Sequence, residues 1–310
     1  MAGKPIIIDC DPGVDDAIAL MLALRSPALA VQAITVVAGN VPLALTQRNA
    51  RQLVELLERT DIPIYAGCPR PLVRSPITAA DIHGDTGLAG ATLPAPTLPL
   101  QTTHAVSYLI DALRSAPAPI TLATLGPLTN IAVALIQAPD IAAHIERIVM
   151  MGVAITHGNI TPVAEFNIYV DPHAAQVVLT AGIPVTLISL DITHQVLTTP
   201  DRLATLRALG NPVSAIAVAI LSHYGKADEA RLGTNGAPLH DPCVIAYLLQ
   251  PTLFTSTPGT VAVELSSPLT LGQTVVSPPQ VSTPTIDIVH SVDAAGVYDL
   301  LTHCLGRSVD

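Results

Sequence analysis

Four aspartates lie within eight residues near the start of the chain, at Asp9, Asp11, Asp15 and Asp16. Ionised carboxylates this close repel one another unless a cation lies among them. Carboxylate oxygens are the ligands that Ca²⁺ and Mg²⁺ prefer, whereas zinc favours nitrogen and sulfur. If Asp15 and Asp16 merely capped a helix, Asp9 and Asp11 would remain unexplained. The sequence therefore predicts a metal site.

A buried strand and a helix position this cluster. Ile6, Ile7 and Ile8 form an uninterrupted apolar run, which is typical of a central parallel strand covered on both faces. Pro12 and Gly13 end the strand, and a helix is predicted to follow. The acids therefore lie at the carboxyl end of a strand, where α/β sheets bind their ligands.

Polar groups also follow other predicted strands. Asn40 comes after a strand at 31–38, and Gly126 with Pro127 turns the chain after a strand at 119–125. That turn would let the carbonyl of Leu125 face the same sheet edge, and backbone carbonyls are ordinary Ca²⁺ ligands. Alone, Asn40 would be interpreted as a turn residue, but its place at this edge favours contact with a ligand.

A polar loop after a strand at 145–151 carries Asn159, Glu165 and Asn167. If the loop is extended, alternation puts the last two side chains on one face. A carboxylate and amides that converge can hydrogen-bond several hydroxyl groups, as sugar recognition requires. The alternative is a solvated loop, and Asp171 is interpreted as a helix N-cap.

His240 and Asp241 directly precede Pro242 and an apolar helix. Asp241 has the pattern of an N-cap, which is compatible with metal binding if its two oxygens divide between the roles. His240 is a candidate general acid because histidine titrates near neutrality, although a lone histidine is more often structural. His83, in a Gly-rich loop, is open to the same two interpretations.

Short apolar runs alternate with helical patterns along the chain. Strands are predicted at residues 5–9, 31–38, 62–66, 119–125, 145–151 and 184–190. Helices are predicted at residues 15–26, 42–59, 103–115, 127–137, 171–181, 200–209, 213–224 and 240–250. This order predicts an α/β fold with a mainly parallel, Rossmann-like central sheet flanked by helices, in one domain over residues 1–310. Segment 266–284 is expected to join late antiparallel strands.

Charge and composition exclude several classes of function. The net charge is −10, and the only lysines, Lys4 and Lys226, cannot form the basic face that nucleic-acid binding needs. A neutral or cationic small molecule suits the chain better than a phosphorylated one. No apolar run approaches the ~20 residues of a membrane span, and the start has no signal-peptide pattern, so a cytoplasmic location is expected. The four scattered cysteines are expected to be reduced.

Five motifs together resemble the inosine-uridine nucleoside hydrolase family. They occur in the family's order and span most of the chain: Asp9-Cys10-Asp11-Pro12-Gly13-Val14-Asp15-Asp16, Val37-Ala38-Gly39-Asn40, Leu125-Gly126-Pro127-Leu128-Thr129-Asn130, Ala164-Glu165-Phe166-Asn167-Ile168 and His240-Asp241-Pro242. The resemblance implies the nucleoside hydrolase fold and an N-ribohydrolase that releases a purine or pyrimidine base from ribonucleosides. Relatives assemble as homotetramers or homodimers, so the same is expected of this chain.

The resemblance also implies roles for the candidate residues. Ca²⁺ at the bottom of a ribose pocket would be bound by Asp11, Asp16, Asp241 and the carbonyl of Leu125. Asp11 would also be the general base toward the attacking water, and Asp9 would support the ligands from behind. The ribose would be held by the remaining polar side chains and packed by a methionine: Asp15, Asn40, Asn159, Glu165, Asn167 and Met151.

Departure of the base would depend on histidine. Cleavage should pass through an oxocarbenium-like state that carboxylates stabilise. By resemblance, His240 would protonate the leaving base, and His83 would be a second contributor at the base.

Two further features concern the branch of the family. The loops at 71–74, 83–84 and 222–224 resemble those of the bacterial non-specific ribonucleoside hydrolases. The chain lacks the tryptophans of the purine-specific branch, and residues 230–235 depart from the tyrosine-containing pattern of the pyrimidine-preferring branch. Val153 stands where a glycine is common, which is expected to stiffen its loop.

Two alternatives remain open at this point. A haloacid-dehalogenase-type phosphohydrolase also begins with a strand that ends in Asp-x-Asp. That class needs a lysine to neutralise its phosphoryl group, and Lys226 is the only plausible candidate here. A non-catalytic nucleoside- or calcium-binding protein is the other alternative, although every residue that the chemistry requires is present.

Overall fold

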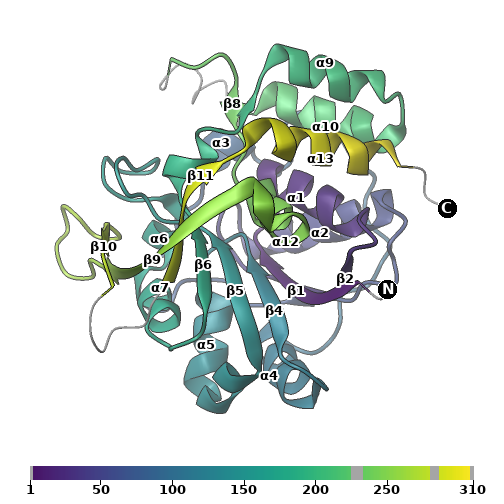
Figure 1. The fold of residues 1–310 in the computed structure, drawn as a ribbon. Helices are drawn as coiled ribbons and strands as arrows, with labels where there is room; N and C mark the ends of the chain where they lie inside the picture. Colours follow the sequence, from purple (N-terminus) through teal and green to yellow (C-terminus); the bar gives the residue numbers. More distant parts are fainter. Residues whose placement is uncertain (1–2, 225–232, 280–285, 308–310) are drawn as a thin grey trace.

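The computed structural model describes residues 3–224, 233–279 and 286–307, which form a central sheet with helices on both faces (Figure 1). The sheet has nine strands in the order β10-β9-β11-β6-β5-β4-β1-β2-β3. Their bounds are β1 Lys4–Cys10, β2 Leu29–Val36, β3 Ile64–Ala66, β4 Ile120–Thr124, β5 Ile145–Met151, β6 Val185–Ile188, β9 Phe254–Val263, β10 Thr274–Ser277 and β11 Ile286–Val292. A separate two-stranded sheet pairs β7 Leu197–Thr198 with β8 Ala237–Pro238.

Most strands of the large sheet run parallel, which confirms the predicted fold class. The antiparallel pairs are β9 with β11 and β9 with β10. The expected late antiparallel strands therefore exist, but β10 lies inside segment 266–284 rather than beyond it. Residues 280–285 of that segment are outside the described residues.

The helices form two layers, one on each face of the sheet (Figure 1). The longer ones are α1 Val14–Leu24, α2 Leu43–Leu56, α4 Ala105–Ser115, α5 Thr129–Gln137, α7 Pro172–Leu179, α9 Pro200–Ala208, α10 Pro212–His223, α12 Pro242–Leu249 and α13 Ala294–Gly306. The shorter ones are α3 Ala80–His83, α6 Phe166–Val170, α8 Leu190–Thr193 and the 3₁₀ turns η1 Pro139–His144 and η2 Pro251–Leu253. In the part of the chain that the structure describes, no helix is long and apolar enough to cross a membrane.

The isoleucine run of β1 shows why the sheet needs both layers. Ile6 and Ile8 pack into the core beneath α1, α12 and α13, whereas Ile7 packs into the core beneath α4 and α5. Successive side chains of a strand point to opposite faces, so a strand with three consecutive buried isoleucines must be covered on both sides.

The same pairing brings the candidate residues to one sheet edge. Asp9 of β1 lies level with Thr35 of β2 and with Thr124 of β4. The residues that follow these strands therefore emerge together, and they include Asp11, Asn40 and Leu125. Adjacent parallel strands thus assemble the site from segments far apart in the sequence.

Candidate active site

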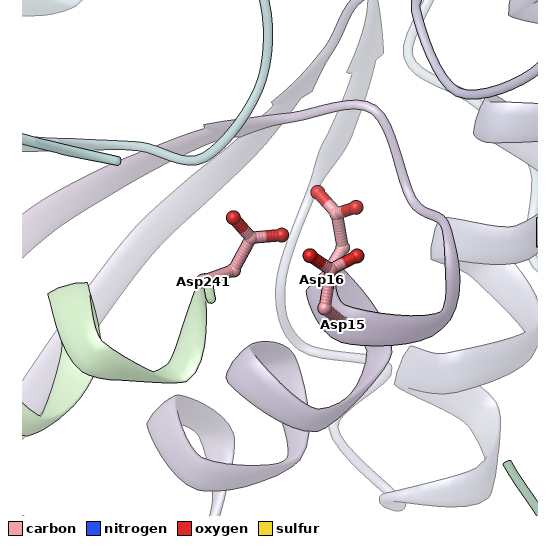
Figure 2. A group of neighbouring side chains, drawn as sticks. All are labelled: Asp15, Asp16 and Asp241. Carbon is pink, nitrogen blue, oxygen red and sulfur yellow. The ribbon is translucent and has the colours of Figure 1, made fainter. Parts of the chain in front are cut away.

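Three carboxylates converge where α1 and α12 begin. One oxygen each of Asp15, Asp16 and Asp241 lies within 4.8 Å of the others, and all three side chains are buried. Figure 2 shows the carboxylate of Asp241 facing those of the other two. Because α1 packs against α12, the first turn of one helix meets the start of the other. This group contains Asp15 in place of Asp11, which the resemblance had put among the metal ligands.

Asp11 lies beside this group in a cradle made by two glycines. Its Oδ2 accepts a hydrogen bond from the backbone N–H of Asn40 at 2.7 Å, while its buried Oδ1 has no hydrogen-bond partner. A Cβ atom on Gly39 would lie 2.1 Å from Oδ2, and one on Gly126 would lie 2.2 Å from Oδ1. Only glycine at both positions lets the two backbones approach the carboxylate this closely.

The carboxylate of Asp16 shapes the loop around it. It accepts hydrogen bonds from the backbone N–H groups of Asp11 at 3.2 Å and Gly13 at 2.9 Å, and from Nδ2 of Asn40 at 3.0 Å. The helix-capping interpretation is therefore correct for Asp16. Asp241, by contrast, stands at the N-cap position of α12 without a side-chain cap, so its oxygens remain with the acidic group.

Burial makes these acids hard to ionise together. It raises the pKa of Asp16 to about 6 and, with the nearby charge of Asp16, that of Asp15 to about 8. Burial also raises the pKa of Asp11 and Asp241 well above the ordinary range, and neighbouring carboxylates add to both shifts. A buried, oxygen-only donor set with unpartnered atoms fits a hard divalent cation, which would let all of these groups ionise.

A pocket opens above the acidic group. Apolar side chains and several polar groups line it together, as is usual for small-molecule sites. Every residue that the resemblance assigned to the ribose or the base lines it: Asp15, Asn40, His83, Met151, Asn159, Glu165, Asn167 and His240. Leu125 and Asp241 line it as well, so the metal candidates and the sugar candidates share one pocket.

The segment after Glu165 is helical, so the condition for alternation along an extended loop is not met. Glu165 is the N-cap of α6, and its carboxylate accepts from the backbone N–H groups of Asn167 at 2.9 Å and Ile168 at 3.1 Å. Both side chains nevertheless line the pocket. The Nδ2 of Asn167 donates to the carbonyl of Leu125 at 2.7 Å, which fixes that carbonyl at the pocket floor.

Val153 supports the same carboxylate through a strained backbone. Its φ is +78°, a value rarely adopted by a β-branched residue. Its N–H donates to Oε2 of Glu165 at 3.3 Å, and its carbonyl accepts from the N–H of Leu190 at 3.0 Å. The strain lies beside a pocket carboxylate, a common location for such backbone.

The two histidines differ in their surroundings. Burial lowers the pKa of His83 to about 3, and its Nδ1 accepts from the N–H of Val14 at 3.1 Å. His83 is therefore neutral with its proton on Nε2, so its 3.9 Å approach to Asp15 is not an ion pair. His240 is held at Nδ1 by Thr193, with Oγ1 at 2.7 Å.

Asp9 is buried and does not line the described pocket. Its Oδ1 accepts from Oγ1 of Thr35 at 2.5 Å and from Nδ2 of Asn130 at 2.8 Å, whereas its Oδ2 has no partner. Burial raises its pKa to about 7. Asp171 is the N-cap of α7, which confirms its structural interpretation.

Sequence reasoning missed part of the pocket lining. Tyr224 and Phe166 bring aromatic rings to a site for which few were expected, and Tyr224 lies 6.1 Å from the ring of His83 and 6.5 Å from that of His240. Phe166 lies in the motif at 164–168 and Tyr224 in the loop at 222–224, so their positions in the sequence could have marked them as pocket residues. The other lining residues that sequence reasoning missed are Ala79, Asp81, Ile82 and Ile160.

Comparison with known proteins agrees with this geometry. The family model described as inosine-uridine preferring nucleoside hydrolase matches residues 6–299. Similar proteins include an uncharacterised protein of Schizosaccharomyces pombe, 47% identical over 97% of this chain and 99% of its own length. Another is the pyrimidine-specific ribonucleoside hydrolase RihA of Escherichia coli K12, 46% identical over 96% of each chain.

Solved structures give the same result. The plant nucleoside hydrolase PpNRh1 superposes with a TM-score of 0.92 at 33% identity, covering 98% of this chain and 99% of its own. A purine-preferring ribonucleoside hydrolase from Gardnerella vaginalis has a TM-score of 0.91 at 32% identity over 98% of each chain.

Proposed function

The chain belongs to the inosine-uridine preferring nucleoside hydrolase family, and on that premise we propose that it cleaves ribonucleosides with the help of bound Ca²⁺. It is a nucleoside hydrolase, an enzyme that acts on N-glycosyl bonds. We propose Ca²⁺ as the cofactor and assign a preferred base and residue roles below. We also propose that residues 1–310 form a single domain, that the protein is cytoplasmic, and that it assembles into homotetramers or homodimers.

The observation that carries the proposal is the buried acidic group at the floor of the pocket. Three carboxylates gather there with Asp11 beside them, and the buried Oδ1 atoms of Asp11 and Asp15 have no hydrogen-bond partner. We assign the cation to Asp11, Asp16, Asp241 and the carbonyl of Leu125. When bound, Ca²⁺ would neutralise these charges and make a nearby water more acidic.

Asp11 is the proposed general base. Its Oδ2 is committed to the N–H of Asn40, and its Oδ1 is left to take a proton from the attacking water. The glycines at 39 and 126 hold the carboxylate in place. Asp9 supports this region from behind through Asn130 and Thr35.

The ribose is held by the polar side chains of the pocket. Asp15 and Asn40 approach from the β1 and β2 side, and Asn159, Glu165 and Asn167 from the loop after β5. The carboxylate of Glu165 also stabilises positive charge on the sugar as the glycosidic bond breaks. Met151 packs against the sugar face.

The departing base needs a proton or a strong hydrogen bond. His240 is proposed as the proton donor, and neutral His83 as a hydrogen-bond donor through Nε2. Similar proteins at 44% and 46% identity are pyrimidine-specific enzymes, not the non-specific ones that the loop motifs suggested. We therefore propose uridine and cytidine as the preferred substrates.

Substrate comparison tests the proposal. The protein should release free base from uridine and cytidine faster than from inosine and adenosine, and chelation of calcium should abolish release until Ca²⁺ is restored. Release of nitrophenol from p-nitrophenyl phosphate without release of base would instead favour the phosphohydrolase. Of the two lysines, Lys4 pairs with Glu146 at 3.5 Å, and Lys226 is outside the described residues. Calcium-dependent nucleoside binding without turnover would indicate a binding protein.

A further inference from the structure

The ring of His240 is held from behind by a hydroxyl group. Its Nδ1 lies 2.7 Å from Oγ1 of Thr193, whose side chain is fully buried. His240 lines the pocket, whereas Thr193 is not among the described residues that line it. Thr193 therefore holds the Nδ1 edge of the ring, and the proposed contact with the base falls to Nε2.

The hydroxyl of Thr193 has a second neighbour, the carbonyl of Leu190 at 3.4 Å. A hydroxyl offers one proton and two acceptor sites, so it can serve either form of the ring. Either atom of the contact with Nδ1 can therefore be the donor, and the hydroxyl orients the ring in both cases.

Backbone hydrogen bonds fix both partners of this contact. Leu239, directly before His240, donates its N–H to the carbonyl of Val196 at 2.8 Å, and Val196 donates to the carbonyl of Thr193 at 3.0 Å. At the other end of α8, Leu190 donates to the carbonyl of Val153 at 3.0 Å. These backbone hydrogen bonds fix the segments that carry Thr193 and His240, and so fix the position of the Thr193 hydroxyl relative to the ring.

We propose that Thr193 is a positioning residue that holds the Nε2 edge of His240 toward the departing base. The inference rests on the proposed function and adds a residue to it. Thr193 touches neither the sugar nor the base, and its effect is confined to the step in which the base leaves. Substrates whose leaving group needs no proton should not depend on it.

Thr193→Val is the test, because valine keeps the shape of the side chain and removes the hydroxyl. On uridine, kcat should fall about 10- to 100-fold, the range for losing a partner that orients a functional histidine. KM should change little, since the pocket lining is intact. Hydrolysis of p-nitrophenyl riboside should be nearly unchanged, because nitrophenolate leaves without a proton. Thr193→Ser should restore kcat on uridine.

Thr198→Val is the matched control. Thr198 is a buried threonine of β7 whose hydroxyl bonds the hydroxyl of Tyr298 and does not line the described pocket. It should lose comparable stability and keep the parental ratio of rates on the two substrates. Equal losses on both substrates for Thr193→Val, or no loss on uridine, would overturn the inference alone. A parent protein that hydrolysed no riboside would overturn the proposed function and this inference with it.

Discussion

Asp16 combines two tasks in one side chain. Its oxygens accept from the N–H groups of Asp11 and Gly13, and they also belong to the acidic group with Asp15 and Asp241. Helix capping and the proposed cation binding are therefore not competing interpretations, because one carboxylate can do both. Substitution at this position should separate the two contributions.

Asp16→Asn should lower calcium affinity by at least ~100-fold, since loss of a direct ligand should cost no less than loss of a supporting partner. Riboside hydrolysis should fall with it. Asp201→Asn, which alters an exposed acid in the first turn of α9, should change neither. The measurements are calorimetric titration with Ca²⁺ and steady-state rates. Stoichiometric calcium of parental affinity in the Asp16→Asn variant would contradict the assignment.

His240 should matter only where the leaving group needs a proton. His240→Ala should slow uridine hydrolysis by ~10²- to 10⁴-fold, the usual contribution of general acid catalysis. Hydrolysis of p-nitrophenyl riboside should remain near the parental rate. Neutral His83 cannot replace an imidazolium, because burial lowers its pKa to about 3. Parallel losses on the two substrates would place His240 in support of the metal site instead.

At the scale of elements, the turn after β4 is as important as the acids. Gly126 and Gly39 approach Asp11 so closely that any side chain there would collide with its carboxylate. The sequence motif pointed to the carbonyl of Leu125, but the steric need for glycine depends on how three strand ends meet. Such contacts cannot be derived from spacing along the chain.

Gly126→Ala should therefore disable the site while leaving the sheet folded. The new Cβ would lie 2.2 Å from Oδ1 of Asp11 and force the carboxylate away. We expect kcat/KM to fall by at least ~100-fold, comparable to losing a group that stabilises the transition state. Gly182→Ala is the control, because it carries positive-φ strain but meets nothing within 4 Å. Its thermal stability should fall and its activity should not.

The core elements of the fold were predicted from periodicity, and β9 and α13 near the end were missed. The strand at 145–151 has the predicted bounds, and the strand predicted at 5–9 is observed as Lys4–Cys10. The predicted helix at 42–59 ends at Leu56. β9 escaped prediction because Pro258 and Gly259 interrupt its pattern and four consecutive residues are exposed. α13 did carry a signal, with Asp293 as N-cap and buried residues four apart at 297, 301 and 305.

On the scale of the whole molecule, the acidic pocket links stability to pH and calcium. In the metal-free protein, burial raises the pKa of Asp16 to about 6, of Asp9 and Glu165 to about 7, and of Asp15 to about 8. The unfolded chain releases these protons near the ordinary pKa values of 3.8 and 4.5. Between those limits the folded state holds more protons, so its free energy of unfolding falls as pH rises.

Calcium should reverse that trend. At pH 5 it must displace protons that the folded state retains, whereas at pH 8 most of these carboxyl groups are ready to ionise. The rise in Tm on adding Ca²⁺ should therefore be larger at pH 8 than at pH 5, as measured by scanning calorimetry with and without chelator. Equal shifts at the two pH values would contradict the linkage, and Asp16→Asn should show only small shifts at both.

The distance along the chain between Asp16 and Asp241 has a consequence for synthesis. The aspartate-rich turn leaves the ribosome before its partner at the start of α12, which follows more than two hundred residues later. At about 5 to 20 residues per second, the turn would wait roughly 10 to 45 s. The proposed cation therefore lacks its full set of ligands until Asp241 has been synthesised, and nascent chains stalled before Asp241 should retain no calcium on a desalting column.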